Sequence, residues 1–476
     1  MTAKDALGPL ERRISSGGDA VAVLTLYLFL LVAVPSRLIV GPLGSAGTPA
    51  TILGILCLFW WVWARLNRAQ TGSVRTQPVR LAMGCFIAVI GIAYVLAMVR
   101  AIDPKEISTA DSGLLVVAGW FGVLLVANDG IPSSDRLTVL LRRVAFAAGA
   151  LATLGVAQFI TKLPITDYIV IPGLTPNVPL YSVLDRSGFA RPAGTALHPI
   201  EFGTVLTMIL PIALTCAMHD DGRAVVRRWF PVLMIAIAIP LSISRSSLVG
   251  AAIGLLILLP TWSRSARIAA TGFIAVLLLG VFLTVPGMLG VLGGLFTGIG
   301  QDSSAQSRTG SYDIAWEFIQ RSPLLGRGFG TFLPVYRIFD NQYLGMLVEI
   351  GIVGVLAFVG LLGASIACSR QARRLSTDPQ VRQQAQSLVA STVVAGAVMS
   401  LFDAFSFPMF TGMVFLILGM SGAIWRLVRE ADELPLEPAF PVHAATSTPP
   451  AKIRTFKPTR RVAGLPAAHL RANQSQ

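Results

Sequence analysis

Long apolar stretches recur from one end of the chain to the other, and they restrict its fold more than any other feature. A helix needs roughly 17 to 25 apolar residues to cross the roughly 30 Å hydrocarbon core of a bilayer, and a helix satisfies its backbone hydrogen bonds internally there. Twelve such stretches are assigned: 19–40, 48–66, 81–99, 111–128, 144–162, 199–218, 229–244, 247–262, 267–286, 341–366, 386–403 and 407–426. The sequence therefore predicts an all-α, polytopic membrane protein, with the first stretch as an anchor and not a removable signal peptide.

The distribution of charge supports this prediction and suggests an orientation. Of the 476 residues, 54% are hydrophobic and only 13% are charged, whereas soluble domains carry roughly 25% charged residues. The even-numbered connections are rich in arginine, which by the positive-inside rule makes them and both termini cytoplasmic. The net charge of +14 then follows from topology and from the neighbouring anionic lipids, so no nucleic-acid partner is expected.

The chain divides into a membrane domain and a tail. The membrane domain is assigned to residues 1–426, and residues 427–476 form a basic tail, rich in Pro and Ala, that we expect to be disordered. Two of the outward connections are long, 163–198 and 287–340, and they hold most of the polar groups suited to chemistry. The four cysteines lie in or beside the spans, so neither a disulfide nor a metal site is expected.

An arginine interrupts the apolar region in the middle of the chain. Residues 239–254 read "IPLSISRSSLVGAAIG", with Arg245 among serines. Residues 229–262 are too many for one span, so we predict two spans joined by a tight outward turn, with Arg245 at the membrane boundary. Charged groups among membrane helices are functional by default, although an arginine that caps a turn or extends toward the interface is the alternative.

Further arginines occupy the long outward connections, where the positive-inside rule does not place them. The first connection ends in "YSVLDRSGFARPAGTALHPIEFG", which supplies Arg186, Arg191, His198 and Glu201. The second contains Arg308 and Arg327, and its residues 309–321 have helical apolar spacing, which predicts an amphipathic helix on the outer interface. Arginines at a lipid surface suit a lipid-borne phosphate or diphosphate, which guanidinium groups bind through paired hydrogen bonds.

Three motifs together resemble a known family. They are "RPAGTALHPIEFG" at 191–203, "SISRSSLVGAAIG" within the central turn, and "AWEFIQRSPLLGRGFGTF" followed by "DNQYLGMLVEIGIVG". In this order they are similar to the O-antigen ligase and O-antigen polymerase (Wzy-type, WaaL-like) superfamily of integral membrane glycosyltransferases, and they cover residues 191–354. The resemblance implies a GT-C-like fold and transfer of glycans from a polyprenyl-diphosphate carrier on the outer face of the bacterial cytoplasmic membrane.

The resemblance also implies roles for individual residues. Arg191, Arg245 and Arg308 would line an outward cavity and bind the carrier diphosphate. Many ligases of the family have a histidine just before the asparagine of the third motif, whereas this chain has Asp340. This departure favours polymerase-like members or a carboxylate base. Implied partners are the donor, a glycan or lipid acceptor, membrane lipids and other polysaccharide assembly proteins.

For the donor that the resemblance implies, the chemistry can be argued on its own terms. A carrier-linked sugar diphosphate is already activated, so the reaction needs no cofactor. Arginines can neutralise the departing diphosphate without a metal, and a nearby carboxylate or imidazole can take the acceptor proton. Asp340 is the leading base, followed by Glu201, Asp313 and His198, and a single displacement would invert the anomeric configuration.

Several of these residues have structural alternatives. Asp340 could be the N-cap of the helix that follows it, since Asp is favoured there. Arg191 and Arg308 could be solvated loop charges, and His198 could have only a structural role at a helix start. Glu349 is interpreted as a structural contact beside Gly351.

Two other classes of function remain open. One is a secondary transporter or a flippase for an anionic or lipid-linked substrate, but the chain lacks the related halves typical of transporters. The other is a non-catalytic scaffold for polysaccharide assembly, which would not require the ordered motifs.

Overall fold

The computed structural model describes residues 19–67, 76–177, 184–186, 188–220, 222–297 and 303–433. The tail predicted for residues 427–476 lies outside these ranges except for its first seven residues. Those residues belong to the last helix, which continues to Glu433, beyond the predicted end of the membrane domain at residue 426.

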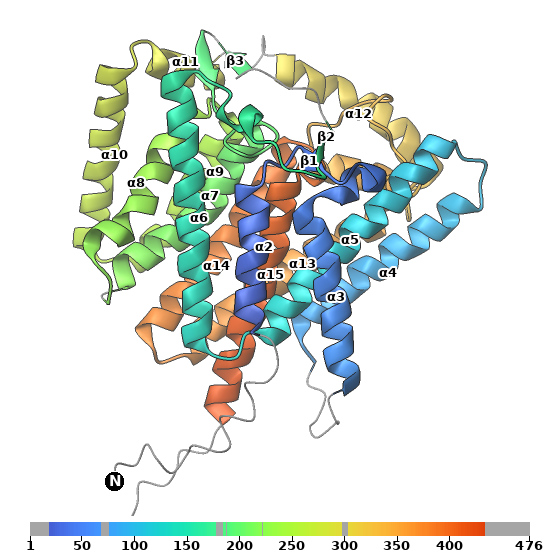
Figure 1. The fold of residues 1–476 in the computed structure, drawn as a ribbon, viewed down its shortest axis with the longest axis horizontal. Coiled ribbons are helices and arrows are strands. Elements are labelled where there is room, and N and C mark those ends of the chain that lie inside the picture. The colour runs from blue at the N-terminus through green and yellow to red at the C-terminus, as the bar shows by residue number, and fades with distance from the viewer. Residues whose placement is uncertain are drawn as a thin grey trace, which may run out of the picture. The chain divides into compact units, whose positions relative to one another are not determined.

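The described chain is almost entirely helical (Figure 1). Its α-helices are α2 (Ala20–Ala33), α3 (Pro49–Asn67), α4 (Pro78–Met98), α5 (Pro104–Gly130), α6 (Ser134–Thr161), α7 (Pro199–His219), α8 (Val225–Leu241), α9 (Arg245–Leu258), α10 (Arg264–Thr284), α11 (Met288–Thr297), α12 (Ser303–Arg321), α13 (Gln342–Leu375), α14 (Pro379–Val398) and α15 (Pro408–Glu433). Short 3-10 turns are η1 (Gly41–Gly47), η2 (Ile165–Tyr168), η3 (Leu259–Thr261), η5 (Met399–Leu401) and η6 (Ala404–Ser406).

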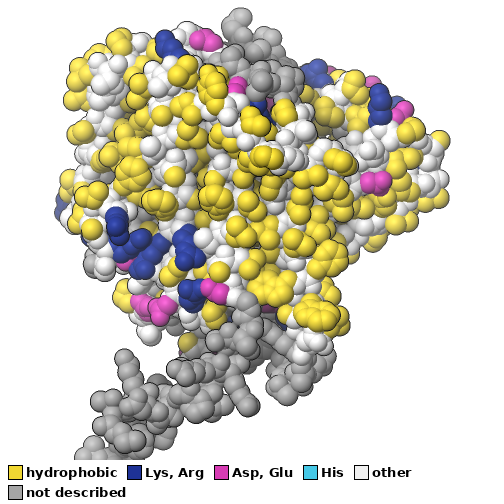
Figure 2. Space-filling view, in the orientation of Figure 1, with side chains coloured by type: hydrophobic (Ala, Val, Ile, Leu, Met, Phe, Trp, Pro, Cys, Tyr) yellow, Lys and Arg dark blue, Asp and Glu magenta, His cyan; other side chains and the backbone are white. Residues whose placement is uncertain are grey.

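Each of the twelve predicted spans falls on a helix, but not all of these helices have the length of a span. Within the described ranges, nine helices are long and apolar enough to cross a membrane. The exceptions are α2 and α9, with 14 residues each, and α8, with 17. On the face shown in Figure 2, apolar side chains cover most of the surface, and the charged side chains lie mainly toward its two ends. The chain is thus a polytopic membrane protein.

The helices differ in how far they are enclosed by others. Helices α7 and α15 are buried along nearly all of their length, whereas α10 is buried along almost none of it. Small residues allow close approach elsewhere: a Cβ added to Gly122 of α5 would lie 2.1 Å from the backbone oxygen of Gly54 on α3. Such small residues permit tight packing of membrane helices, where no hydrophobic effect drives association.

The long connections contain more structure than expected. Between α6 and α7, strand β3 (Leu184–Arg186) pairs antiparallel with β4 (Phe189–Arg191), and β2 (Thr175–Pro176) pairs with β1 (Leu38–Ile39). Between α10 and α13 lie α11 and α12, and α12 contains the helix predicted at 309–321.

The predicted break in the central apolar region is present. Helix α8 ends at Leu241 and α9 begins at Arg245. Between them, Ile243 is fully buried and adopts φ +45°, a left-handed conformation that costs a non-glycine residue about 1–2 kcal/mol. Such strain persists only where surrounding contacts hold it, and it is frequent at functional sites.

Candidate functional site

The break between α8 and α9 is joined to strand β4 by an arginine. Arg191 is buried, and its Nε donates a hydrogen bond to the backbone oxygen of Ser242 at 3.1 Å. Ser242, Ser244, Ser246 and Ser247 are also buried, and Arg245 is the first residue of α9. The start of a helix favours anions because its backbone N–H groups and dipole point outward. The break thus combines a helix N-terminus with two arginines.

Helix α7 begins beside this break. A Cβ added to Gly203 would lie 2.0 Å from the Ser247 hydroxyl, so the first turn of α7 lies against α9. His198 is the N-cap of α7, and its Nδ1 accepts a hydrogen bond from the Ile200 N–H at 3.1 Å. Burial and the nearby Arg191 charge lower the pKa of His198 to about 4. The imidazole is therefore neutral near pH 7 and is a weak base.

Glu201 has the contacts of a capping carboxylate. It is fully buried and accepts hydrogen bonds from the N–H groups of Leu197 (2.7 Å), Met409 (2.7 Å) and Phe410 (3.2 Å). Met409 and Phe410 lie in the first turn of α15, whose N-terminal dipole favours a negative charge. Glu201 therefore ties the start of α7 to the start of α15, and its oxygens are held by the backbone.

Asp340 is not the N-cap of α13, which corrects the structural alternative raised for it. Asn341 is the N-cap, because its Oδ1 accepts from the N–H groups of Tyr343 (3.0 Å) and Leu344 (3.4 Å). Asp340 is half-buried, and its carboxylate forms no hydrogen bond or ion pair with any described residue. Capping of α13 therefore does not explain why residue 340 is an aspartate.

A second carboxylate, which the sequence reasoning missed, lies near Asp340. Asp403 precedes η6 and is hydrogen-bonded to the Ser406 side chain. Burial, together with the negative charge of Asp340, raises the pKa of Asp403 to about 6. The available signal was its position, since an acid at the end of a predicted span is a functional-site hypothesis.

The connection between α14 and α15 links these acids to the α7 side of the site. The Phe405 N–H donates to Gln342 Oε1 of α13 at 2.7 Å, and the Phe407 ring lies 6.3 Å from that of His198. Contacts therefore run continuously along one end of the bundle. We define the candidate site by five residues along this path: Arg191, His198, Arg245, Asp340 and Asp403.

Arg327 is engaged elsewhere. Its guanidinium forms an ion pair with Glu106 of α5 at 2.5 Å and lies 5.3 Å from the Phe318 ring centroid. Glu106 is buried, and its carboxylate also binds Arg100 (3.3 Å) and the Tyr336 hydroxyl (2.7 Å). These contacts hold the segment before α13 against α5. Sequence reasoning missed Glu106 because nothing local marks it as a partner of Arg327.

The two halves of the third motif dock onto each other. Helix α13 is broken at Gly351, which has φ +64°. At this break the Arg327 N–H donates to the Val348 oxygen at 3.0 Å, and the Ile352 N–H donates to the Pro323 oxygen at 3.0 Å. Glu349 accepts from the Phe332 N–H at 3.4 Å, in agreement with a structural role. The spacing of glycines in this motif thus reflects close backbone contact.

Two predicted residues cannot be placed through their side chains. Arg186 lies in β3 and Arg308 in α12, but both side chains are outside the described part of the structure. On α12, Ala315 is buried against the segment before α13, whereas Tyr312 and Trp316 are exposed. The predicted helix therefore presents aromatic side chains at its surface. Asp313 is also exposed on α12.

The described contacts include two kinds of group, namely anion-binding groups at the α8–α9 break and two acids near the start of α13 and the α14–α15 connection. The guanidinium groups of Arg191 and Arg245 and the start of α9 favour a phosphate or diphosphate. The Asp340 carboxylate does not cap α13, and its charge adds to the burial that raises the pKa of the nearby Asp403. Buried groups with shifted pKa values cluster at functional sites.

Comparison with known proteins bears on the same region. No match was found among the curated proteins compared with the chain. Residues 230–359 match the family model described as O-antigen ligase, a stretch that runs from α8 into α13 and includes Arg245, Arg308, Arg327 and Asp340. The match agrees with the resemblance inferred from the motifs: residues 230–359 of this membrane protein are similar to the O-antigen ligase family.

Proposed function

We propose that the protein is a glycosyltransferase that polymerises or ligates polyprenyl-diphosphate-linked oligosaccharide in surface polysaccharide biosynthesis. The observation that carries the proposal is that the O-antigen ligase match includes a helix break that holds Arg245 and is bound by Arg191, together with an acid, Asp340, that does not cap α13. The site would lie at the outer face of the bacterial cytoplasmic membrane, with both termini cytoplasmic.

The arginines would act on the leaving group. As the acceptor oxygen bonds to the anomeric carbon, the bond from that carbon to the diphosphate oxygen breaks, and the polyprenyl diphosphate departs with added negative charge. Arg191, Arg245 and the N-terminus of α9 would stabilise this charge, and loss of one such group costs about 10²–10³ in rate. This charge stabilisation would make the reaction independent of a metal.

Asp340 is the residue best suited to accept the acceptor proton. His198 has its pKa lowered to about 4 and its Nδ1 occupied, and Glu201 is held by three backbone N–H groups. Attack from the face opposite the diphosphate in a single step would invert the anomeric configuration. Arg186 and Arg308 are proposed as further contacts to the donor.

The experiment is complementation of a strain that lacks the native copy, with membrane levels matched. Arg245→Ala and Asp340→Asn are expected to abolish long surface polysaccharide. Arg264→Ala is the control, because Arg264 is an exposed arginine at the start of α10. Single repeat units accumulating on the carrier would identify a polymerase, and full-length carrier-linked polymer would identify a ligase. Intermediates confined to the cytoplasmic face would indicate a flippase, and normal polysaccharide in both variants would refute the proposed site.

A further inference from the structure

A large cleft runs along α2, α6 and α8, from the end of the bundle opposite the candidate site to Thr195 near the start of α7. It has a volume of about 1060 Å³, at the upper end of the roughly 300–1,000 Å³ of small-molecule sites. Its lining on α6 extends from Val139 to Leu154, which is about 22 Å of helix at about 1.5 Å per residue. This length exceeds one leaflet, which is half of the roughly 30 Å hydrocarbon core. We call it the α2–α6–α8 groove.

One end of the groove is strongly basic. Among the residues that the structure describes, its lining includes five arginines, namely Arg142, Arg143, Arg223, Arg227 and Arg228, and one acidic residue, Asp220. Asp220 is bound by Arg142 at 2.7 Å, and its backbone oxygen accepts from Arg228 at 2.9 Å. Arg223 and Arg227 are exposed and form no ion pair with any described residue. This end therefore carries excess positive charge.

The rest of the groove is apolar and open at its side. Phe29 of α2 and Phe146 of α6 line it and are 60% and 63% exposed. The far end is lined by Thr195, near the start of α7, so the arginines lie at the end of the bundle opposite the candidate site. A ligand matching this lining needs an anionic head and a long apolar tail.

We propose that the α2–α6–α8 groove binds one phospholipid with a negatively charged head group, whose phosphate contacts Arg143, Arg223 and Arg227 and whose acyl chain lies on Phe29 and Phe146. Basic pockets between membrane helices bind anionic head groups by the same electrostatics. The lipid belongs to the leaflet opposite the candidate site, so it is distinct from the proposed donor.

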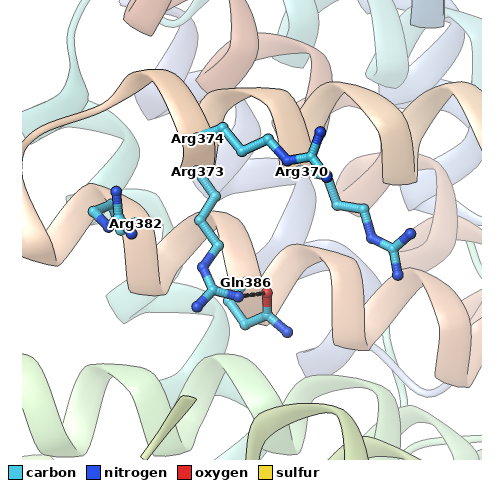
Figure 3. Close-up of a pocket in the computed structure, with 5 residues that line it drawn as sticks. All are labelled: Arg370, Arg373, Arg374, Arg382 and Gln386. Atoms are coloured by element: carbon cyan, nitrogen blue, oxygen red, sulfur yellow. Dashed lines mark hydrogen bonds between the residues drawn. The ribbon is translucent and has the colours of Figure 1, made fainter. Parts of the chain in front are cut away.

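A second basic pocket provides a matched control. It holds Arg370, Arg373 and Arg374 of α13 with Arg382 and Gln386 of α14 (Figure 3). It measures about 340 Å³, and the described residues that line it are all charged or polar. Thr138 of α6 accepts from Gln384 of α14 at 2.8 Å, so the pocket lies toward the same end of the bundle as the groove arginines. It has comparable charge but no place for an acyl chain.

The test is native mass spectrometry of the full-length protein, titrated with dioleoyl phosphatidylglycerol or dioleoyl phosphatidylcholine. Wild type should retain one phosphatidylglycerol in preference to phosphatidylcholine. Arg143→Gln/Arg227→Gln should weaken its binding about thirtyfold, and Phe29→Ala/Phe146→Ala should weaken it about tenfold. Two controls should leave phosphatidylglycerol binding unchanged. They are Arg370→Gln/Arg374→Gln in the second pocket and Phe282→Ala on α10, where Phe282 is 60% exposed.

Three results would overturn the proposal. Equal retention of both lipids by wild type would exclude recognition of the head-group charge, and this result needs no variant to fold. Equal weakening of phosphatidylglycerol binding in Arg143→Gln/Arg227→Gln and in Arg370→Gln/Arg374→Gln would indicate general attraction of the lipid to positive charge. Glycerol phosphate or inorganic phosphate that displaces the lipid at similar concentration would identify a phosphate site in which the apolar groove has no role.

Discussion

Arg191 and Ser242 are 51 positions apart in the chain, yet the Arg191 Nε donates to the Ser242 backbone oxygen at 3.1 Å. This bond joins the strand before α7 to the left-handed turn at Ile243. The turn ends α8 and directs the start of α9 toward the same region. One arginine therefore connects the first two sequence motifs, and its charge also acts on His198.

The first prediction concerns that charge. Arg191→Gln should raise the pKa of His198 above about 4, because a nearby positive charge no longer opposes protonation. The pKa should stay below 6.5, since burial continues to disfavour the imidazolium. Titration of ¹³C-labelled histidines by NMR measures the change. An unaltered His198 pKa would show that Arg191 does not act on the imidazole.

The second prediction separates the two acids. Asp340→Asn should lower the transfer rate about 10²–10⁴-fold, the usual contribution of a general base. It should also lower the pKa of Asp403 below about 6, because the Asp340 charge raises it. Steady-state transfer assays across pH check the first effect. Equal transfer rates in wild type and Asp340→Asn at every pH would remove Asp340 from the mechanism.

Asp403 should also make stability depend on pH. Its folded pKa of about 6 exceeds the ordinary 3.8, so the folded state binds the proton more tightly than the unfolded state. The resulting stabilisation is complete below about pH 4 and is lost as pH rises through 6. Asp403→Asn should therefore gain thermal stability relative to wild type between pH 5 and 8, by at most about 3 kcal/mol. A pH-independent difference in thermal midpoint would contradict this.

The third prediction concerns the Glu106 contacts. Glu106→Gln removes the charge that balances Arg327 and Arg100, and breaking a buried ion pair from one side costs about 3–5 kcal/mol. Limited proteolysis should then cleave the segment before α13 more readily. Asp111→Asn is the control on the same helix, because Asp111 is exposed and its one hydrogen bond to a described residue comes from the half-buried Tyr94. Similar cleavage of both variants would show that Glu106 does not hold the segment.

The fourth prediction tests the interlocked motif. Gly351→Ala should destabilise the protein by about 3 kcal/mol, since the added Cβ would lie 2.3 Å from the Leu324 backbone and φ is +64°. Gly360→Ala, further along α13, meets no atom within 4 Å and should be neutral or stabilising by up to about 1 kcal/mol. The thermal midpoints of the purified variants compare the two. Equal midpoints would show that the docking at Gly351 is dispensable.

Local features of the sequence determined the membrane helices, the helix at 309–321 and the break before Arg245. Each of these features is visible within a few tens of residues. The length of an apolar stretch indicates a membrane helix, apolar spacing indicates the helix at 309–321, and serines around a charge indicate the break. The same reasoning assigned twelve spans where nine described helices have the full length, because the apolar stretches at α2, α8 and α9 extend past the ends of these short helices.

Only the tertiary structure decided which polar groups meet. It brought Asp403 near Asp340, paired Glu106 with Arg327 across 221 positions, and made Asn341 and not Asp340 the cap of α13. It also showed that Glu201 caps the start of α15. Apolar length is a property of one segment and can be measured along the chain. Hydrogen bonds between distant segments depend on how the helices pack, and no local pattern in one sequence records that packing.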